Sequence, residues 1–325
     1  MKITKHLYPL KFIPILKEKV WGGNKLAQVY NKEDFKNIGE SWEISGVQES
    51  ISIVSNGNLK GTSLNQLIET FKEYLVGKEV YQNFGNTFPL LFKFIDAKED
   101  LSVQLHPNDI LAKERHQSFG KTEMWYILDA EKDARLILGF NQEMNETIYK
   151  KHLLKNSLTD ILHSEKVNKG DSFFIAPGTI HAIGSGVVLA EIQQTSDITY
   201  RIFDWDRPSI GGELRELHND LALEAINFAP IDAKLKYSEK TNTPISLCKS
   251  PYFITNKLVL SEKIKRDISK IDSFVVYMCV EGEATFKTKG HSEMILKGET
   301  ILIPSVIKKL RIKTNQATLL EVYMP

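Results

Sequence analysis

Two strand-like stretches of the sequence place metal-binding side-chain types beside turn residues. In SVQLHPND, Gln104 and His106 alternate with apolar residues, and a proline follows at once. Side chains two apart on a strand point to the same face, so this amide and this imidazole would share one side of a sheet. His181 lies in PGTIHAIG, next to a Pro-Gly turn. Both histidines would therefore stand at strand ends, where the mouths of barrels hold ligand sites.

A carboxylate completes a set of donors that suits a divalent metal ion. Glu123 begins the strand-like run EMWYIL and could join Gln104, His106 and His181 from another strand. Imidazole nitrogens with carboxylate and amide oxygens suit Zn²⁺, and a catalytic site would keep a position open for water or substrate. The ligand types are also compatible with Mn²⁺ or Fe²⁺. Taken singly, each residue is more readily explained as an ordinary polar residue of a half-buried strand than as a ligand.

Three cations stand where an anionic ligand could be held. Arg201 lies in the apolar and aromatic run YRIF, where a buried charge needs a partner, so it could hold a substrate anion or form a salt bridge. The nearby aspartates are Asp197, Asp204 and Asp206. Lys93 interrupts the apolar strand PLLFKFI, and Lys121 lies two residues before Glu123. The two lysines could clamp a phosphate, although spacing alone favours Lys93 extending to solvent.

Short β-type runs separated by turn residues must position these side chains. The runs are rich in Val, Ile, Phe and Tyr, with Gly, Pro, Asn or Asp between many of them. Many short strands joined by turns indicate sandwiches or barrels, so we predict a mainly β fold. A few helices interrupt the strands, and we expect them at 63–81, 109–118, 146–164 and 217–228.

An internal similarity favours two related β-barrels. The stretch KGDSFFIAPGTIHAI resembles KGETILIPSVIKKL near the C-terminus. In the second copy, Phe274 and Lys308 occupy the positions that correspond to Glu123 and His181. A repeat of this kind indicates duplication, with ligand-type side chains in the first copy alone.

The length of 325 residues exceeds that of a usual single domain. The polar and irregular stretch 232–250 marks the boundary. We therefore expect a catalytic metal-binding domain with helical insertions at 1–232, and a C-terminal barrel without metal ligands at 233–325.

The bulk composition argues against several kinds of partner. The formal net charge is +1 and no basic block is visible, so nucleic acid is not expected to bind. No apolar run approaches the roughly 20 residues needed to span a bilayer, so a membrane is not expected either. With only two cysteines, a disulfide framework is not expected, which fits the reducing cytoplasm.

The runs together resemble the class I mannose-6-phosphate isomerases, in particular the short bacterial type. The resemblance is strong over about 1–215 and is carried by GESWEIS, PLLFKFIDAKEDLSVQLHPND, GKTEMWYIL and PGTIHAIGSGVVLAEIQQTSDITYRIFDWDR. It implies two cupin- or jelly-roll-type β-barrels, a single zinc ion per chain and a phosphosugar substrate. The implied reaction is the reversible conversion of mannose 6-phosphate to fructose 6-phosphate.

The resemblance also implies roles for single residues. The implied metal ligands are Gln104, His106, Glu123 and His181. Arg201 is implied to be the catalytic arginine, and Glu191 matches a proton-transfer residue. Ser102 and Lys121, with Lys93, are implied to bind the substrate phosphate. The chain lacks the long helical insertion of the larger eukaryotic-type enzymes, so contacts made from that insertion do not carry over.

The chemistry explains why such groups are needed. Aldose–ketose isomerisation removes a proton next to a carbonyl and passes through a cis-enediol, so negative charge develops on the carbonyl oxygen. Zinc and Arg201 could stabilise that charge, and Glu191 could be the base. Alternatively, zinc only orients the substrate and another residue is the base.

The competing functions are an isomerase of a different phosphosugar, a non-catalytic sugar-binding cupin and a metal-dependent oxygenase.

Overall fold

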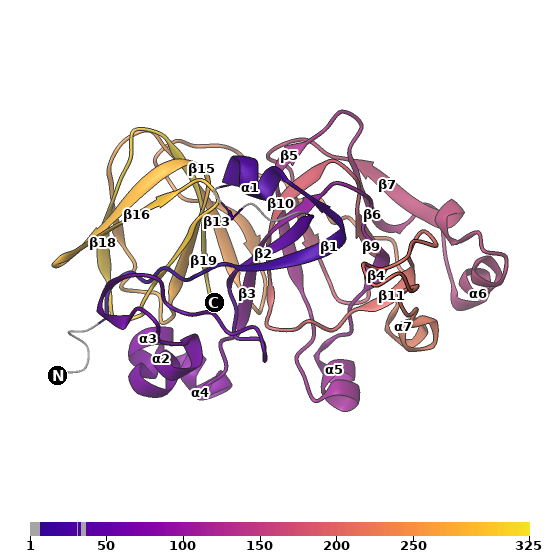
Figure 1. Cartoon of the computed structure of the whole chain (residues 1–325), viewed down its shortest axis with the longest axis horizontal. Helices are drawn as coiled ribbons and strands as arrows, with labels where there is room; N and C mark the ends of the chain where they lie inside the picture. The colour runs from indigo at the N-terminus through magenta and orange to yellow at the C-terminus, as the bar shows by residue number, and fades with distance from the viewer. Residues whose placement is uncertain (1–6, 31, 34–36) are drawn as a thin grey trace.

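Three β-sheets form the framework of the protein, in a computed structural model that describes residues 7–30, 32–33 and 37–325. Two of the sheets belong to the N-terminal two thirds of the chain, and the third is built by the C-terminal strands, which are orange to yellow in Figure 1. The predicted mainly β fold with accessory helices is confirmed. No helix in the described ranges is long and apolar enough to cross a membrane.

The first sheet has six strands and its interior strands are buried on both faces. Its order is β1 (Ile15–Gly23), β2 (Ile38–Ile44), β3 (Leu90–Ala97), β10 (Val187–Gln194), β5 (Glu123–Ala130) and β8 (Ser172–Ile175), and every pairing is antiparallel. Every residue of β3 and β10 is buried. Strands of this kind read as nearly continuous apolar runs, because other parts of the protein cover both faces.

The second sheet lies opposite the first. Its order is β11 (Tyr200–Phe203), β4 (Val103–Leu105), β9 (His181–Ile183), β6 (Arg135–Phe140) and β7 (Leu162–Lys166). Trp125 and Ile127 from the first sheet share an apolar cluster with Leu136 and Ile183 from the second. The inner faces of the two sheets therefore pack on each other, as expected for a barrel-like sandwich.

The C-terminal strands form a third, eight-stranded sheet with its own apolar core. Its strands are β12 (Ile245–Lys249), β13 (Ile254–Leu260), β14 (Ile264–Asp267), β15 (Val275–Thr288), β16 (His291–Leu296), β17 (Thr300–Ile303), β18 (Lys309–Lys313) and β19 (Ala317–Tyr323). On the outer face of the first sheet, Phe92 and Phe94 share a cluster with Val276 and Leu320 of the third. One face of β3 thus packs against the C-terminal strands, and the alternate residues of β3 point into the first barrel.

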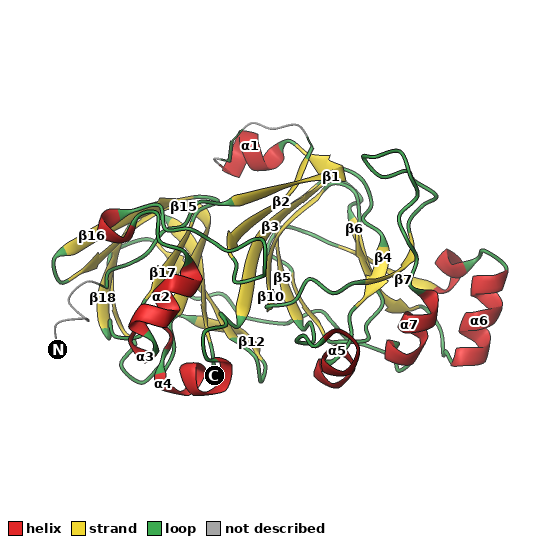
Figure 2. Cartoon of the chain, turned by 60° about the horizontal axis from the view of Figure 1, so that its bottom comes forward, coloured by secondary structure: helices red, strands yellow, loops and turns green. Residues whose placement is uncertain are grey.

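The helices lie outside the sheets, as Figure 2 shows. They are α1 (Lys25–Tyr30), α2 (Leu64–Phe71), α3 (Glu73–Val76), α4 (Lys78–Phe84), α5 (Asp109–His116), α6 (Glu146–Leu154) and α7 (Asn219–Ala225), with 3₁₀ helices at Gly57–Leu59 and Leu158–Ile161. Those expected at 109–118 and 217–228 are present as α5 and α7. The helix expected at 146–164 ends at Leu154, because Asn156 takes a φ of 53°, and a 3₁₀ helix then leads into β7 at Leu162.

The single helix expected at 63–81 is instead three short ones. The chain breaks at Lys72, with φ of 48°, and at Gly77, with φ of 101°. At Gly77 the backbone touches the C-terminal barrel, since a Cβ there would lie 2.2 Å from the carbonyl oxygen of Asp272. The side chain of Asp272 accepts hydrogen bonds from the backbone N–H groups of Lys78 and Glu79, at 3.1 and 3.2 Å. Because of the break, α4 begins at the point where a carboxylate from a distant part of the chain accepts hydrogen bonds from its first N–H groups.

Candidate metal centre and substrate cavity

Three ligand-type side chains converge where the two facing sheets meet. His106 directly follows β4, Glu123 begins β5, and His181 begins β9. All three are buried, and each offers a ligand atom within 4.8 Å of the others. His106 Nε2 lies 3.2 Å from Glu123 Oε1, and His181 Nε2 lies 4.0 Å from Glu123 Oε2. Among the described residues, the structure thus brings together three of the four predicted ligands.

The inward atoms of these side chains have no hydrogen-bond partner. Nε2 of both histidines and both oxygens of Glu123 are buried and make no hydrogen bond within the described part of the chain, although Lys121 and His106 lie within ion-pair distance of Glu123 Oε1. The outward Nδ1 atom of His106 lies 2.9 Å from the Ile198 carbonyl oxygen, and Nδ1 of His181 lies 2.9 Å from that of Thr179. Each Nδ1–H can thus donate to a carbonyl, which leaves a lone pair on Nε2. Buried polar atoms without partners are costly, so this arrangement fits a bound cation.

The protonation states suit metal binding. Burial, with the charge of Lys121 adding to it, lowers the pKa of His106 to about 3, and burial also lowers the pKa of His181. Both imidazoles are therefore neutral near pH 7, which is the form that binds a metal. Burial alone would raise the pKa of Glu123, but the charge of Lys121, together with the contact with His106, holds it well below its ordinary value.

Gln104 lies beside this group. It pairs with His181 in the β4–β9 register, and its side-chain oxygen accepts a hydrogen bond of 3.2 Å from the hydroxyl of Ser102. The side chain is half-buried and lines the adjoining cavity. Its role as a fourth ligand stays a prediction.

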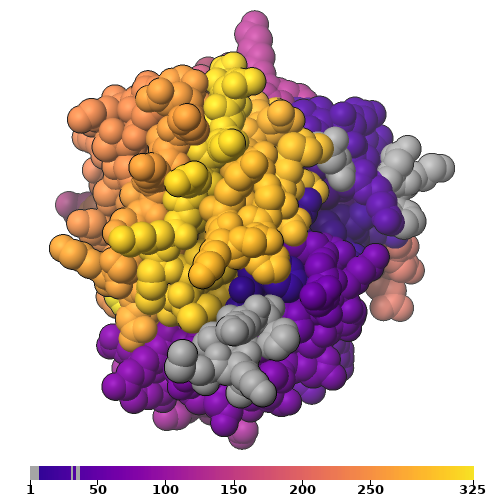
Figure 3. Space-filling view, turned by 90° about the vertical axis from the view of Figure 1, so that its left-hand side faces the viewer, coloured from indigo at the N-terminus to yellow at the C-terminus, as the bar shows by residue number. Residues whose placement is uncertain are grey.

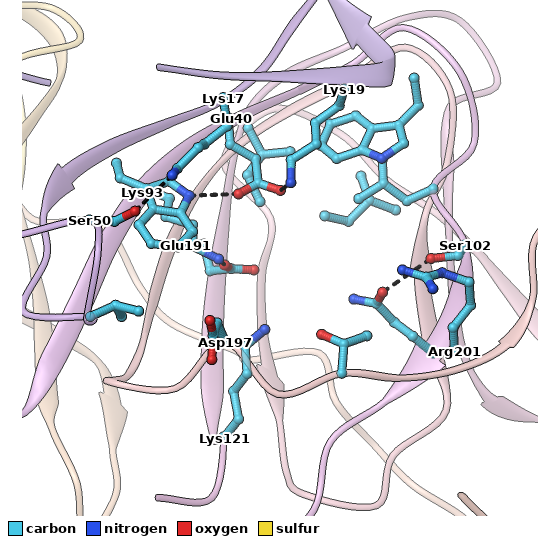
Figure 4. A pocket seen from close by; sticks show the side chains of 18 of the residues that line it. Lys17, Lys19, Glu40, Ser50, Lys93, Ser102, Lys121, Glu191, Asp197 and Arg201 are labelled. Atoms are coloured by element: carbon cyan, nitrogen blue, oxygen red, sulfur yellow. Dashed lines mark hydrogen bonds and ion pairs between the residues drawn. The ribbon is translucent and has the colours of Figure 1, made fainter. Parts of the chain in front are cut away.

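A cavity of about 530 Å³ adjoins the three buried residues, and Lys121 connects the two. The Nζ atom of Lys121 lies 3.1 Å from Glu123 Oε1. Every residue that the sequence predicted for catalysis or substrate binding lines the cavity, namely Lys93, Ser102, Lys121, Glu191 and Arg201. Figure 4 shows these side chains around the hollow, with Ser102 and Arg201 together on one side. The structure thus brings residues from distant stretches of the sequence to one space.

Lys93 does not extend to solvent, contrary to the expectation from spacing. It is buried, and its Nζ atom lies 2.8 Å from Glu191 Oε1. Strand β3 lies between β2 and β10 with both faces covered, so the side chain cannot reach the outer surface and points into the cavity instead. Trp125 donates from Nε1 to the other oxygen of Glu191, at 2.9 Å. The three residues are cross-strand neighbours in register, which fixes the carboxylate from both sides.

The charges around Glu191 set its proton affinity. Burial raises the pKa of Glu191, and the charge of Glu123 raises it further, against the opposing charge of Lys93. Burial alone would lower the pKa of Lys93, but Glu191 and Glu40 raise it above its ordinary value. Glu191 is thus a buried carboxylate with raised proton affinity at the cavity wall, a property of general bases.

Arg201 has no salt bridge to the three aspartates considered for it, within the described ranges. Its Nη1 atom donates to the Glu216 carbonyl oxygen at 2.9 Å, and its buried Nε has no partner. Asp204 is instead paired with Arg207 and Arg215. The guanidinium therefore keeps donors for a ligand in the cavity.

Sequence reasoning missed a group of polar and aromatic residues from β1 and β2. Lys19 lies 3.2 Å from Glu40, which also accepts a hydrogen bond of 2.6 Å from Trp42 Nε1. Lys17 lies 4.8 Å from the centre of the Trp42 ring. The signal for two of them was present, because Glu40 and Trp42 alternate in GESWEIS. Trp125 was missed because its contact with Glu191 joins distant strands.

Comparison with known proteins places the chain in a family. Residues 10–151 match the family model described as phosphomannose isomerase type I, catalytic domain, and residues 244–324 match the one described as mannose-6-phosphate isomerase, cupin domain. Mannose-6-phosphate isomerase ManA of Bacillus subtilis is 36% identical over 300 residues, or 91% of this chain and 93% of that protein. This chain belongs to the type I mannose-6-phosphate isomerase family.

Other members of the family agree over nearly the whole length. The mannose-6-phosphate isomerase of Streptococcus mutans is 32% identical over 308 residues, or 92% of this chain and 93% of that protein. The crystal structure of the mannose 6-phosphate isomerase from Bacillus subtilis matches with a TM-score of 0.88 at 30% identity, over 97% of this chain and 99% of that one. The predicted family resemblance and the cupin-type fold are confirmed.

Proposed function

We propose that this protein is a mannose-6-phosphate isomerase that uses one zinc ion to interconvert mannose 6-phosphate and fructose 6-phosphate. The observation that carries the proposal is the convergence of His106, Glu123 and His181, with buried unpartnered atoms, beside a cavity lined by cations. Membership of the family, whose relatives carry that name, supports the choice of substrate.

Zinc would be held by His106, Glu123 and His181, with Gln104 as a fourth ligand. Two neutral imidazoles with oxygen donors are a common set of zinc ligands. A catalytic zinc ion typically also keeps one coordination position that water or substrate can occupy. When bound, the ion would supply Lewis-acid polarisation of the sugar's carbonyl oxygen.

Glu191 would be the group that moves the proton. A carboxylate with raised pKa takes a proton from C2 of the open-chain aldose more readily than an exposed one, and the protonated form can return it to C1. The electron pair left by that proton forms the C1–C2 double bond of a cis-enediol, while the π electrons of the C1 carbonyl move to its oxygen, which takes up a proton. When the carbon proton returns to C1, the hydroxyl oxygen on C2 releases its proton and becomes the ketose carbonyl oxygen, so that one proton is gained and one is lost at oxygen. Lys93 and Trp125 hold the two oxygens of Glu191 and would fix its aim.

The remaining cations would hold and stabilise the substrate. Arg201, with donors left for a ligand, would stabilise the negative charge that develops on the carbonyl oxygen. Lys121 and Ser102 line the same cavity and would contact the phosphate, so that binding at a remote group orients the reacting end. Lys93 also lines the cavity, and its ion pair suggests that it acts chiefly through Glu191.

We propose the domain division at 1–232 and 233–325, with metal ligands in the first domain. The positions in the second barrel that correspond to ligands support this. Phe274 is buried against Phe88, with ring centres 4.6 Å apart, and Lys308 donates to the Ile271 carbonyl oxygen at 3.2 Å. Both cysteines are free and buried, which supports a cytoplasmic location.

Metal analysis combined with a coupled isomerase assay tests the function. We expect one zinc ion per chain, turnover of mannose 6-phosphate to fructose 6-phosphate, loss of turnover with chelator and recovery with added zinc. Turnover of glucose 6-phosphate in preference to mannose 6-phosphate would instead identify an isomerase of another phosphosugar. Sugar binding without any turnover would identify a non-catalytic homologue.

A further inference from the structure

The outer side of the C-terminal barrel carries a second hollow, lined mainly by cations. It has a volume of about 750 Å³, and seven of its ten lining residues are Lys or Arg, against one acidic residue. The chain as a whole has a formal net charge of only +1, so this excess is local. Strand β18 marks this end of the molecule in Figure 1, opposite β4 and β9 of the candidate metal centre, and Figure 3 looks onto it.

The outward cations of β14, β18 and β15 make up what we call the basic face. They are Lys265, Lys287, Lys309, Arg311 and Lys313, with Lys289 in the turn that follows β15. Arg311 is paired in register with Lys265 on one side and with Lys287 on the other. Side chains directly opposite on neighbouring strands have Cβ atoms about 5 Å apart, and like charges there destabilise a sheet. Three cations in a row are therefore a cost to the fold.

No acidic side chain offsets this row within the described residues. Asp267 is 3.6 Å from Lys309, and no ion pair or hydrogen bond joins an acid to Lys265, Lys287 or Arg311. Arg266 points the other way and binds the buried Glu321 at 2.7 Å. An uncompensated row of this kind is understandable if an anionic ligand supplies the missing charge.

We propose that the basic face binds a linear polyphosphate chain. A single phosphate would satisfy only a part of the row, whereas cations about 5 Å apart across strands and about 7 Å apart along them can follow a chain of phosphates. No aromatic side chain lines the hollow, so it offers no platform for nucleic-acid bases. A polyphosphate chain can also enter a hollow, whereas the surface of a bilayer is flat. Binding here would be independent of the isomerase activity proposed above.

Calorimetric titration of the full-length protein with inorganic polyphosphate tests this site. The face variant carries Lys265→Gln, Lys287→Gln and Arg311→Gln. The control variant carries Lys132→Gln, Lys151→Gln and Lys155→Gln, at exposed lysines on or near the first barrel and α6 that do not line the hollow. Both leave the cations of the substrate cavity unchanged, so the difference between them isolates the basic face.

We expect polyphosphate affinity to fall at least about tenfold in the face variant, to stay within about twofold in the control, and to weaken with salt in the parent. The thermal midpoint of the ligand-free face variant should equal or exceed that of the parent, because repulsion has been removed. Equal polyphosphate affinity in the parent and the face variant would overturn the proposal. Tighter binding of single-stranded RNA of the same phosphate count, or of anionic vesicles, would overturn it too.

Discussion

At the residue scale, the chemistry depends on which atoms are left without a partner. Each histidine of the candidate metal centre is fixed through Nδ1 and presents Nε2 to Glu123. Arg201 is fixed through one nitrogen and keeps others for a ligand. Removing a histidine of the centre and removing Arg201 should therefore have different effects on zinc content and turnover.

His181→Ala should lose zinc and isomerase activity together. Removing one of three close ligands leaves an incomplete site, so we expect zinc content near zero and turnover at least about 100-fold lower. Metal analysis and the coupled assay on the same sample measure both. His163→Ala, at an exposed histidine on β7, is the matched control and should keep both. A His181→Ala protein with full zinc content would remove this residue from the site.

Arg201→Ala should separate the two properties. The side chain is not one of the three converging ligands, so zinc content should stay unchanged while kcat falls about 100-fold or more through the loss of charge stabilisation. Arg135→Ala, at an exposed arginine outside the cavity, should keep full turnover. Unchanged kcat in Arg201→Ala would rule out its catalytic role.

At the scale of elements, the sequence predicted strands well and missed what distant strands impose. Period-two alternation placed Gln104 on one face of β4, and turn residues marked the ends. By contrast, the burial of Lys93 depends on Glu191, which is 98 residues away and supplies its partner. The apolar stripe in 63–81 gave no sign of the breaks, because Asp272 of the C-terminal barrel sets the one at Gly77. Local pattern thus predicted the elements, while tertiary contacts decided where they end and which charges are buried.

Gly77→Ala should destabilise the contact between the helices and the C-terminal barrel. The new Cβ would lie 2.2 Å from the Asp272 carbonyl oxygen, at a φ of 101°. We expect the free energy of unfolding to fall by about 2–4 kcal/mol. Gly61→Ala, at a φ of 90° with nothing within 4 Å, controls for backbone strain alone and should cost about 1 kcal/mol. Equal losses in urea unfolding would mean that the contact contributes nothing.

At the scale of the whole molecule, the first barrel gathers cations and carboxylates in its interior, and this links stability to pH. Glu40 is a measurable example, with 13% of its side chain exposed. Burial alone would raise the pKa of Glu40, but Lys93 and Lys19 lower it to about 2. A carboxyl group with a lowered pKa in the folded state stabilises the fold above its ordinary pKa, and this contribution is lost as the pH falls towards the folded value.

Glu40→Gln should therefore lower the free energy of unfolding most near neutral pH. We expect a loss of at most about 3 kcal/mol there, and a loss smaller by about 1 kcal/mol near pH ~3.5. Urea unfolding at the two pH values measures the difference. Glu146→Gln, which removes an exposed ion pair on α6, should cost less than about 0.5 kcal/mol at both. A Glu40→Gln loss that grows on acidification would contradict the assigned direction.

The most direct test of the central claim is a crystal structure of the active enzyme with anomalous diffraction measured at the zinc edge. We expect one strong anomalous peak about 2.0–2.2 Å from Nε2 of His106, Nε2 of His181 and a carboxylate oxygen of Glu123. A fully active crystal sample with no peak among these three residues, or with its zinc bound elsewhere, would contradict the account.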